Sequence, residues 1–149
     1  MRRESGEHGL LVGLVCCGAA VACAADRNWN SGSGAQWTNA ATWVEGAVPT
    51  ADDNALLNNS NTITIASGVA AVAKNVALSN VTANTYQVLL LANGASLTVG
   101  GAITDPGAGI ADIKVYNTNA ANAASVLVAS SVACREFSIP ADAPGPQYL

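Results

Sequence analysis

The chain has 149 residues, of which 50% are hydrophobic, 11% charged and 5% aromatic, and this length suits a single domain. Six basic residues against ten acidic ones give a net charge of −4, and no cluster of Lys and Arg follows Arg3. The sequence therefore lacks the basic surface that binds nucleic acid, and its many small residues argue against a core built from large side chains.

The first 25 residues have the order of parts of a secretory signal peptide. Arg2-Arg3 precedes an uncharged, mostly apolar stretch, Gly9–Ala25, and the polar Asp26 follows at once. Ala22-Cys23-Ala24 offers the small-x-small pattern of a cleavage site. We therefore expect residues 1–25 to be removed on export, so that the mature protein is secreted or lies at the cell surface.

Two other interpretations of this segment stay open. The 17 residues of Gly9–Ala25 reach the lower bound for a membrane span, although their many Gly and Ala weaken a retained anchor. A lipid anchor at Cys23 is the other, because Ala20–Cys23 loosely resembles a bacterial lipobox without its usual Leu. No later segment is long and apolar enough to span a bilayer, so we expect no membrane span after signal removal.

Signal removal would leave a chain with little catalytic chemistry. Cys16, Cys17 and Cys23 lie in the segment to be removed, so Cys134 alone remains and no internal disulfide can form. His8, the single histidine, leaves as well, which excludes Ser-His-Asp and Cys-His catalysis and removes the commonest ligand of zinc and copper. We expect no cofactor, no bound metal and no enzymatic activity.

Residues 26–60 form a segment of their own, ahead of the strand-rich part of the chain. They contain every tryptophan of the protein, Trp29, Trp37 and Trp43. An extended segment would direct these three side chains to one side, because they share the same parity, and exposed rings there could stack on sugars. The interpretation we favour is that they form a cap over the open end of the fold that follows.

From residue 61 the sequence consists of short runs of apolar and β-branched residues separated by Gly, Asn and Ser. These are strand and turn signals, and helical periodicity is poor. Only residues 70–77, which are rich in Ala, offer a helix as an alternative. The expected strands are Thr62–Ile65, Val69–Leu78, Gln87–Leu91, Ser96–Ile103, Asp112–Tyr116 and Ser125–Val128.

An internal repeat decides how we expect these strands to be arranged. Ile63–Gly68 aligns with Leu89–Gly94 at an offset of 26, and a weaker echo lies at Val126–Ser130. Repeats of this length are typical of solenoids, in which each coil buries its interior by stacking on the next. We therefore predict an all-β fold, a short right-handed parallel β-helix with Ile65 beside Leu91 and both pointing inward.

The alternative fold is an antiparallel β-sandwich. Asn93-Gly94 lies between two apolar runs, which by itself favours a hairpin of two adjacent antiparallel strands. The expected organisation is a cap segment at 26–60, solenoid coils at 61–133 and an irregular, proline-rich tail at 134–149.

The segment 28–58 resembles the opening segment of bacterial secreted and autotransporter-like β-helical passenger domains. The resemblance rests on Trp37 and Trp43 at a spacing of six, on Gly46–Pro49 and on Asp52-Asp53, followed by the Thr-Ile-Thr-Ile repeat. It implies a β-helix outside the cell that serves as a stalk, adhesin or surface coat, with surface polysaccharide or host and cell-surface molecules as partners. Such passengers are usually much longer, so the chain resembles a fragment of one.

Few acidic residues lie together in the expected mature chain. Asp52, Asp53 and Asn54 could supply oxygen ligands to Ca²⁺, but they lack the regular spacing and the distal Glu of calcium loops, so we favour a solvated turn after Pro49. The alternative function is a carbohydrate-binding or carbohydrate-active β-helix protein, in which Asp52, Asp53 or Asp112 would act as a base.

Overall fold

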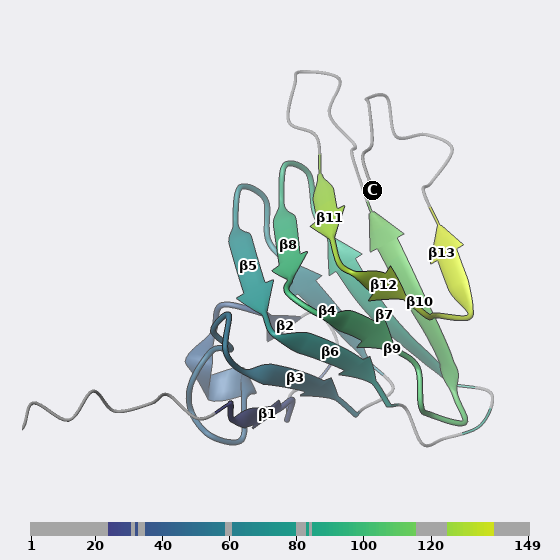
Figure 1. Cartoon of the computed structure of the whole chain (residues 1–149), viewed down its shortest axis with the longest axis horizontal. Coiled ribbons are helices and arrows are strands. Elements are labelled where there is room, and N and C mark those ends of the chain that lie inside the picture. Colours follow the sequence, from purple (N-terminus) through teal and green to yellow (C-terminus); the bar gives the residue numbers. More distant parts are fainter. Residues whose placement is uncertain are drawn as a thin grey trace, which may run out of the picture.

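The structure is a computed structural model that describes residues 24–30, 32, 35–58, 61–79, 83, 85–115 and 125–138. These residues form a β-solenoid of about four coils (Figure 1), which confirms the predicted short right-handed parallel β-helix. The one helical element in the described ranges is the 3-10 turn η1 (Ala40–Thr42). The helix considered for residues 70–77 is wrong, because those residues form strands.

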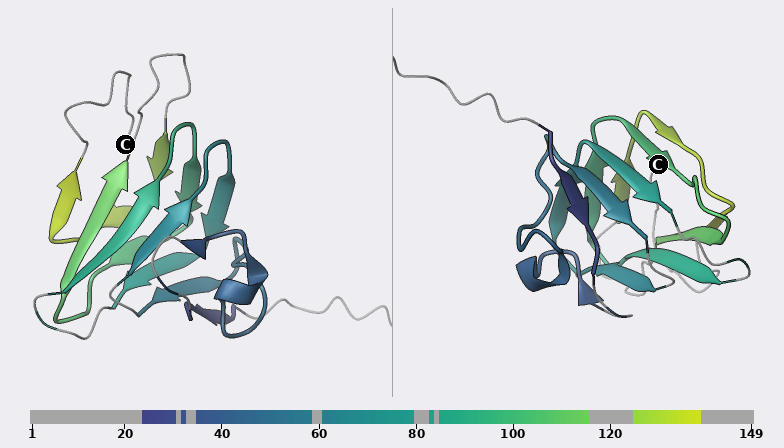
Figure 2. Two further views of the ribbon diagram at one scale, coloured as in Figure 1. Left: turned by 180° about the vertical axis from the view of Figure 1, so that it is seen from behind. Right: turned by 90° about the horizontal axis from the view of Figure 1, so that it is seen from below.

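Three parallel sheets enclose the interior of the solenoid. Each of the three complete coils contributes a short strand to each sheet, and Figure 2 shows the strands side by side from two further directions. One sheet contains β1 (Asp26–Asn28), β3 (Asn54–Leu57), β6 (Asn75–Leu78), β9 (Ala102–Thr104) and β12 (Ser131–Val132). A second contains β2 (Ala35–Gln36), β4 (Thr62–Ile65), β7 (Tyr86–Leu91), β10 (Ile110–Val115) and β13 (Glu136–Ser138), and the third β5 (Ala70–Ala73), β8 (Ser96–Val99) and β11 (Val126–Val128).

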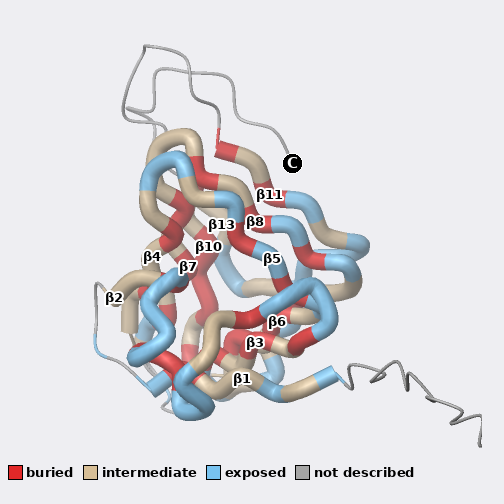
Figure 3. The backbone as a smooth tube through the Cα atoms, turned by 90° about the vertical axis from the view of Figure 1, so that its left-hand side faces the viewer, coloured by how far each residue is buried: buried red, intermediate tan, exposed pale blue. Residues whose placement is uncertain are grey.

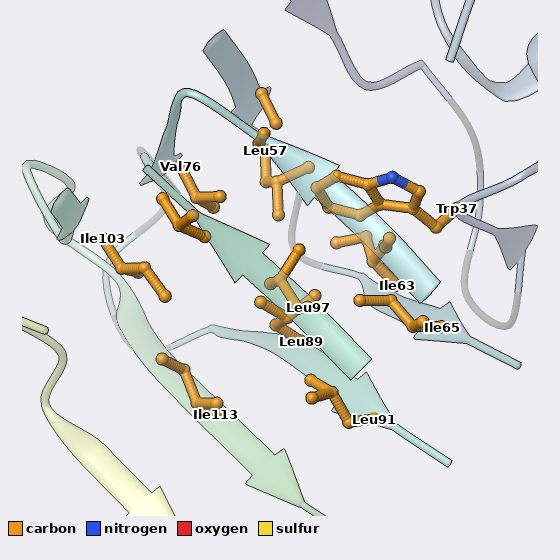
Figure 4. Close-up of a cluster of buried hydrophobic side chains, with 14 of the residues drawn as sticks. Trp37, Leu57, Ile63, Ile65, Val76, Leu89, Leu91, Leu97, Ile103 and Ile113 are labelled. Atoms are coloured by element: carbon orange, nitrogen blue, oxygen red, sulfur yellow. The ribbon is translucent and has the colours of Figure 1, made fainter. Parts of the chain in front are cut away.

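The interior consists of columns of apolar side chains that stack from coil to coil. Ile63, Leu89 and Ile113 are register partners in β4, β7 and β10, and all three are fully buried (Figure 4). Ile65 likewise pairs with Leu91, as predicted. Buried and less buried positions alternate along the strands (Figure 3), because successive side chains of a strand point to opposite faces.

The antiparallel sandwich is wrong, because every ladder between the named strands is parallel. Asn93-Gly94 turns the chain from β7 into β8, which belongs to another sheet. Gly94 and Gly68 occupy equivalent corners of successive coils with φ of 69° and 73°, a conformation that glycine adopts without steric cost. The corners also contact each other, since the Ser67 hydroxyl donates a 2.6 Å hydrogen bond to the Asn93 carbonyl.

Two expected strands are each divided by a corner. The run from Val69 to Leu78 bends at Lys74 between β5 and β6, and the run from Ser96 to Ile103 bends at Gly100-Gly101 between β8 and β9. Gly101 has a steric reason to be there, because a Cβ at this position would collide with the Asn75 side chain of the coil below. Apolar residues on both sides of each corner face the interior, so the sequence pattern carries no sign of the bend.

The expected boundaries of the solenoid also differ from the structure. Strands β1, β2 and β3, inside the segment 26–60, already pair with the coils, and β13 pairs with β10 inside the expected tail 134–149. The echo at Val126–Ser130 was aligned with the wrong face, since β11 stacks on β8 and not on β7. Residues 1–23, which include Cys23 and all but the last two residues of the predicted signal peptide 1–25, lie outside the described ranges, as does Tyr116.

Candidate functional site

The three tryptophans form one buried cluster at the N-terminal end of the solenoid. Trp29, Trp37 and Trp43 are 1%, 1% and 2% exposed. Trp43 lies edge-on to both of the others, with ring centroids 5.0 Å from Trp29 and 5.1 Å from Trp37, which is a favourable geometry for aromatic pairs. The indole Nε1 of Trp43 also donates a 2.9 Å hydrogen bond to the Trp37 carbonyl.

The cluster covers the end of the interior. Strands β1 and β2, which precede Trp29 and Trp37, are the outermost strands of their sheets. The backbone N–H groups of Trp29 and Trp37 continue these ladders, donating to Leu56 and Thr64 at 2.9 Å each. Figure 4 shows the Trp37 ring beside the interior side chains Leu57 and Ile63. The burial of all three rings leaves no face open for a sugar, and it fits the cap interpretation.

Backbone and side-chain contacts close the loop that carries Trp43. Trp29 and Trp43 form an antiparallel bridge, and the carbonyl of Asn28 accepts a hydrogen bond from Val44 N. The carboxylate of Glu45 accepts two more from Asn28, at 2.8 Å from the backbone N and 2.7 Å from Nδ2. The hydrogen bond from the Asn28 side chain is the main reason why the pKa of Glu45 is lowered.

Asp53 is a buried carboxylate that holds the turn after Pro49. Its Oδ2 accepts hydrogen bonds from Thr50 N at 3.0 Å and Thr50 Oγ1 at 2.9 Å, and its Oδ1 accepts one from Ala25 N at 3.2 Å. Arg27 Nε lies 3.2 Å from Oδ2, without the alignment of a hydrogen bond. Burial alone would raise the pKa of Asp53, but the hydrogen bonds from Thr50 and the contacts with Arg27 and Ala25 lower it overall.

This geometry fits a structural turn and not a calcium site. Oδ2 of Asp53 is occupied by the two Thr50 donors, Oδ1 accepts from Ala25, the last residue of the predicted signal peptide, and Asp52 beside it is exposed. Within the described ranges, no three His, Cys, Asp or Glu side chains lie together as metal ligands would. Asp112, the third carboxylate proposed as a base, lies on β10, two coils beyond β3, so the structure does not bring it beside Asp52 and Asp53.

A ladder of amide side chains crosses the coils on the outer face of the first sheet. Asn54 Nδ2 donates to Asp26 Oδ1 at 2.8 Å, and Asn75 Nδ2 donates to Asn54 Oδ1 at 2.9 Å. The ladder ends where Asn75 Oδ1 accepts from Ala102 N at 3.1 Å. Sequence reasoning missed it, although Asn54 and Asn75 each open a strand and pair in register.

An apolar cavity lies at the other end of the solenoid, where β11, β12 and β13 are the outermost strands. We call it the C-terminal cavity. It has a volume of about 460 Å³ and is lined by Leu127, Ala129, Val132, Cys134 and Phe137. The two ends of the molecule therefore differ, since the N-terminal end is filled by tryptophan rings and the described residues leave the C-terminal end hollow.

Charged side chains lie near the C-terminal cavity and are paired with each other. Asp112 is 1% exposed and lies 3.1 Å from Lys114 Nζ, while Asp105 Oδ2 lies 3.9 Å from Arg135 Nε. Burial is the largest cause that raises the pKa of the Cys134 thiol, and the charges of Asp112 and Asp105 add to it. A raised pKa leaves little of the reactive thiolate at neutral pH, which fits a structural cysteine and not a nucleophile.

Comparisons with known families, characterised proteins and solved structures find no match to this chain. In the described part of the chain, no helix has the length and apolar character that crossing a membrane requires. The fold and the two ends define the class of protein: a short parallel β-solenoid with a tryptophan-filled N-terminal end.

Proposed function

We propose that this protein is an exported, non-enzymatic surface module that acts as a structural or adhesive element, similar to part of an autotransporter passenger domain. One observation carries the proposal most directly. The side chains best suited to binding or catalysis, the three tryptophans and Asp53, are engaged in contacts that hold the fold together, and those of Asp53 are with Thr50 and Arg27. A site for sugars would need open ring faces, and a catalytic base would need a carboxylate that a substrate can reach, whereas Asp53 is 4% exposed.

The outer face of the third sheet supports an adhesive role. Val72, Thr98 and Val128 form a column of register partners across β5, β8 and β11. Val72 is 37% exposed and Val128 is 49% exposed, and the outward positions of these three strands carry no charge. Parallel sheets are usually covered on both faces, so an uncharged and partly exposed face suits contact with another surface.

Export is tested by the mass of the chain recovered after expression in a bacterium. The proposal expects the protein outside the cytoplasm with a new N-terminus at or next to Asp26. A full-length chain retained in the cytoplasm would contradict export, whereas a lipid-modified Cys23 would support export with an anchor instead of release.

The non-enzymatic role is tested with the exported chain on a panel of surface polysaccharides, measured both for binding and for release of sugars. We expect binding without product, weakened by Thr98→Lys on the uncharged face. Thr64→Lys, on the outer face of β4, is the matched control and should leave binding unchanged. Release of sugars that Asp112→Asn abolishes would establish the carbohydrate-active alternative and refute the proposal.

A further inference from the structure

Ala25, directly ahead of β1, is bound by the fold through both of its backbone polar groups. Its carbonyl accepts a 2.8 Å hydrogen bond from Asn54 N, which continues the ladder between β1 and β3. Its N–H donates to Asp53 Oδ1 at 3.2 Å. Cleavage after Ala25 would remove the acceptor of Asn54 N and the donor to a carboxylate that is 4% exposed. Polar groups that lose a partner away from water cost free energy, so the fold is more stable with Ala25 retained.

The sequence offers two peptide bonds at which the predicted signal peptide could be removed. The bond after Ala24 has the small residues Ala22 and Ala24 at the third and first positions before it. The bond after Ala25 has Cys23 and Ala25 at these positions, so the residue pattern does not decide between the two bonds. Only hydrolysis after Ala24 leaves the Ala25 nitrogen in place beside Asp53.

Hydrolysis after Ala24 changes the charge of the Ala25 nitrogen. Water supplies the oxygen of the new Ala24 carboxylate and the two protons that convert the Ala25 N–H into an ammonium group. The neutral donor to Asp53 Oδ1 then becomes a cation, and charge-assisted hydrogen bonds are roughly twice as strong as neutral ones. Thr50 holds the other oxygen of Asp53 with two hydrogen bonds, so the carboxylate is already fixed in position to receive the ammonium.

The charges at this end of the solenoid favour a further cation. Arg27 Nε lies 3.2 Å from Asp53 Oδ2, and the positive charge of Arg27 also acts on the carboxylate of Glu45. Asp26, next to the new N-terminus, adds a third carboxylate. Lys74 is a second cation, since it is exposed and its backbone N–H donates to the Asp53 carbonyl at 2.7 Å. Among these residues three carboxylates meet two cations, and an ammonium group at residue 25 balances them.

We propose that the exported chain begins at Ala25 and that its α-ammonium group forms an ion pair with the buried carboxylate of Asp53. This inference rests on the export proposed above, and it adds the bond that is hydrolysed and the partner of the new N-terminus. It shortens the predicted signal peptide by one residue, to 1–24. The ion pair ties the end of the chain to the first coil, where a free terminus would otherwise fray.

The N-terminal residue of the exported protein, determined by mass spectrometry, tests the position of the cleavage. We expect Ala25. Ala24→Leu should abolish cleavage at this bond, because the residue before the bond must be small, whereas the matched Ala25→Leu should leave it in place. An N-terminus at Asp26 or at a lipid-modified Cys23 would overturn this proposal and leave export standing. An intact chain retained in the cytoplasm would refute export itself.

Acylation of the N-terminal amine at pH 7 tests the ion pair, with the chymotryptic peptide 25–29 as the readout. Only the unprotonated amine reacts, and a nearby carboxylate favours the protonated form. We therefore expect acylation about tenfold faster in Asp53→Asn than in the wild type. Asp52→Asn, at the exposed neighbouring residue, is the matched control and should leave the rate unchanged. Equal rates for the wild type and Asp53→Asn would overturn the ion pair.

The wild-type protein alone supplies a second measurement if Asp53→Asn does not fold. Acylation of the N-terminal amine is compared with that of the exposed Lys74 amine in the same sample, with and without urea. Unfolding separates the N-terminus from Asp53, so we expect urea to raise the ratio of the two rates about tenfold. An unchanged ratio would show that the folded protein does not hold the ammonium group, and it would refute the ion pair.

Discussion

Replacing Leu89 with alanine tests the stacked interior where it is most tightly enclosed. Leu89 is fully buried in β7, with Ile63 of β4 and Ile113 of β10 as its register neighbours on either side. Both neighbours are fully buried and belong to strands fixed by ladders, so the space left by three carbon atoms cannot collapse. Leu-to-Ala substitutions in such sites cost about 3 to 5 kcal/mol of unfolding free energy, and we expect about 4 here.

Leu90 supplies a matched control in the same strand. It is the neighbouring residue and the same amino acid, but it points outward and is half-buried, so Leu90→Ala should cost about 1 kcal/mol. The free energies are measured by urea unfolding, with equal m-values as the check that both variants unfold from a similar native state. If Leu89→Ala leaves too little native protein to measure, Leu89→Val serves in its place at about 1 kcal/mol, against an outward Leu90→Val near zero. A cost for Leu90→Ala that equals or exceeds that of Leu89→Ala would refute the inward column, because a slip of one residue exchanges the two faces.

Three further substitutions test individual contacts. Gln87 is fully buried, and neither polar atom of its side chain is hydrogen-bonded. Gln87→Met should therefore raise the unfolding free energy by about 1 to 2 kcal/mol, and a lower unfolding free energy in thermal or urea unfolding would contradict this. Trp43→Phe should lower the unfolding free energy by about 1 kcal/mol more than Trp37→Phe, because the indole N–H of Trp43 is hydrogen-bonded and that of Trp37 is not. Equal losses of unfolding free energy would show that the hydrogen bond from Trp43 contributes nothing to stability. Asp53→Asn should cost about 2 kcal/mol at pH 7. The pKa of Asp53 is lower in the folded than in the unfolded chain, so its stabilisation is complete above the ordinary value of 3.8 and is lost as pH falls through the folded pKa. A wild-type advantage that grew as the pH fell below 3.8 would contradict this sign.

The repeat made the central part of the fold predictable from the sequence. Ile63 and Leu89 occupy the same place in successive coils, so both must be large and apolar, and the two Gly residues that follow must occupy the same corner. The offset changes in later coils because their corners differ in length, which is why the echo at Val126–Ser130 was aligned with the wrong face. An alignment by residue similarity cannot distinguish two inward faces that accept the same side chains.

The ends of the molecule were harder to predict. Strands β1 and β2 contain three and two residues, too few for an alternating pattern to appear in the sequence. The burial of Asp53 is equally hidden, because it depends on Arg27, which the fold brings from the first strand. The three tryptophans could be interpreted from the sequence, because such large side chains in a chain of small residues indicated a cap over the open end of the solenoid.

Parallel stacking in register is tested most directly by a disulfide between two coils. Thr64 and Leu90 are register partners on the outer face of β4 and β7, and neighbouring strands lie about 4.8 Å apart, within the reach of a disulfide. Thr64→Cys with Leu90→Cys would join the tryptic peptides 28–74 and 75–114, neither of which contains a native cysteine. We predict rapid formation of this link under mild oxidation, and little or none for Thr64→Cys with Val88→Cys, two residues out of register. Faster linking of the second pair, or no linking of the first in a folded chain, would contradict the stacked coils.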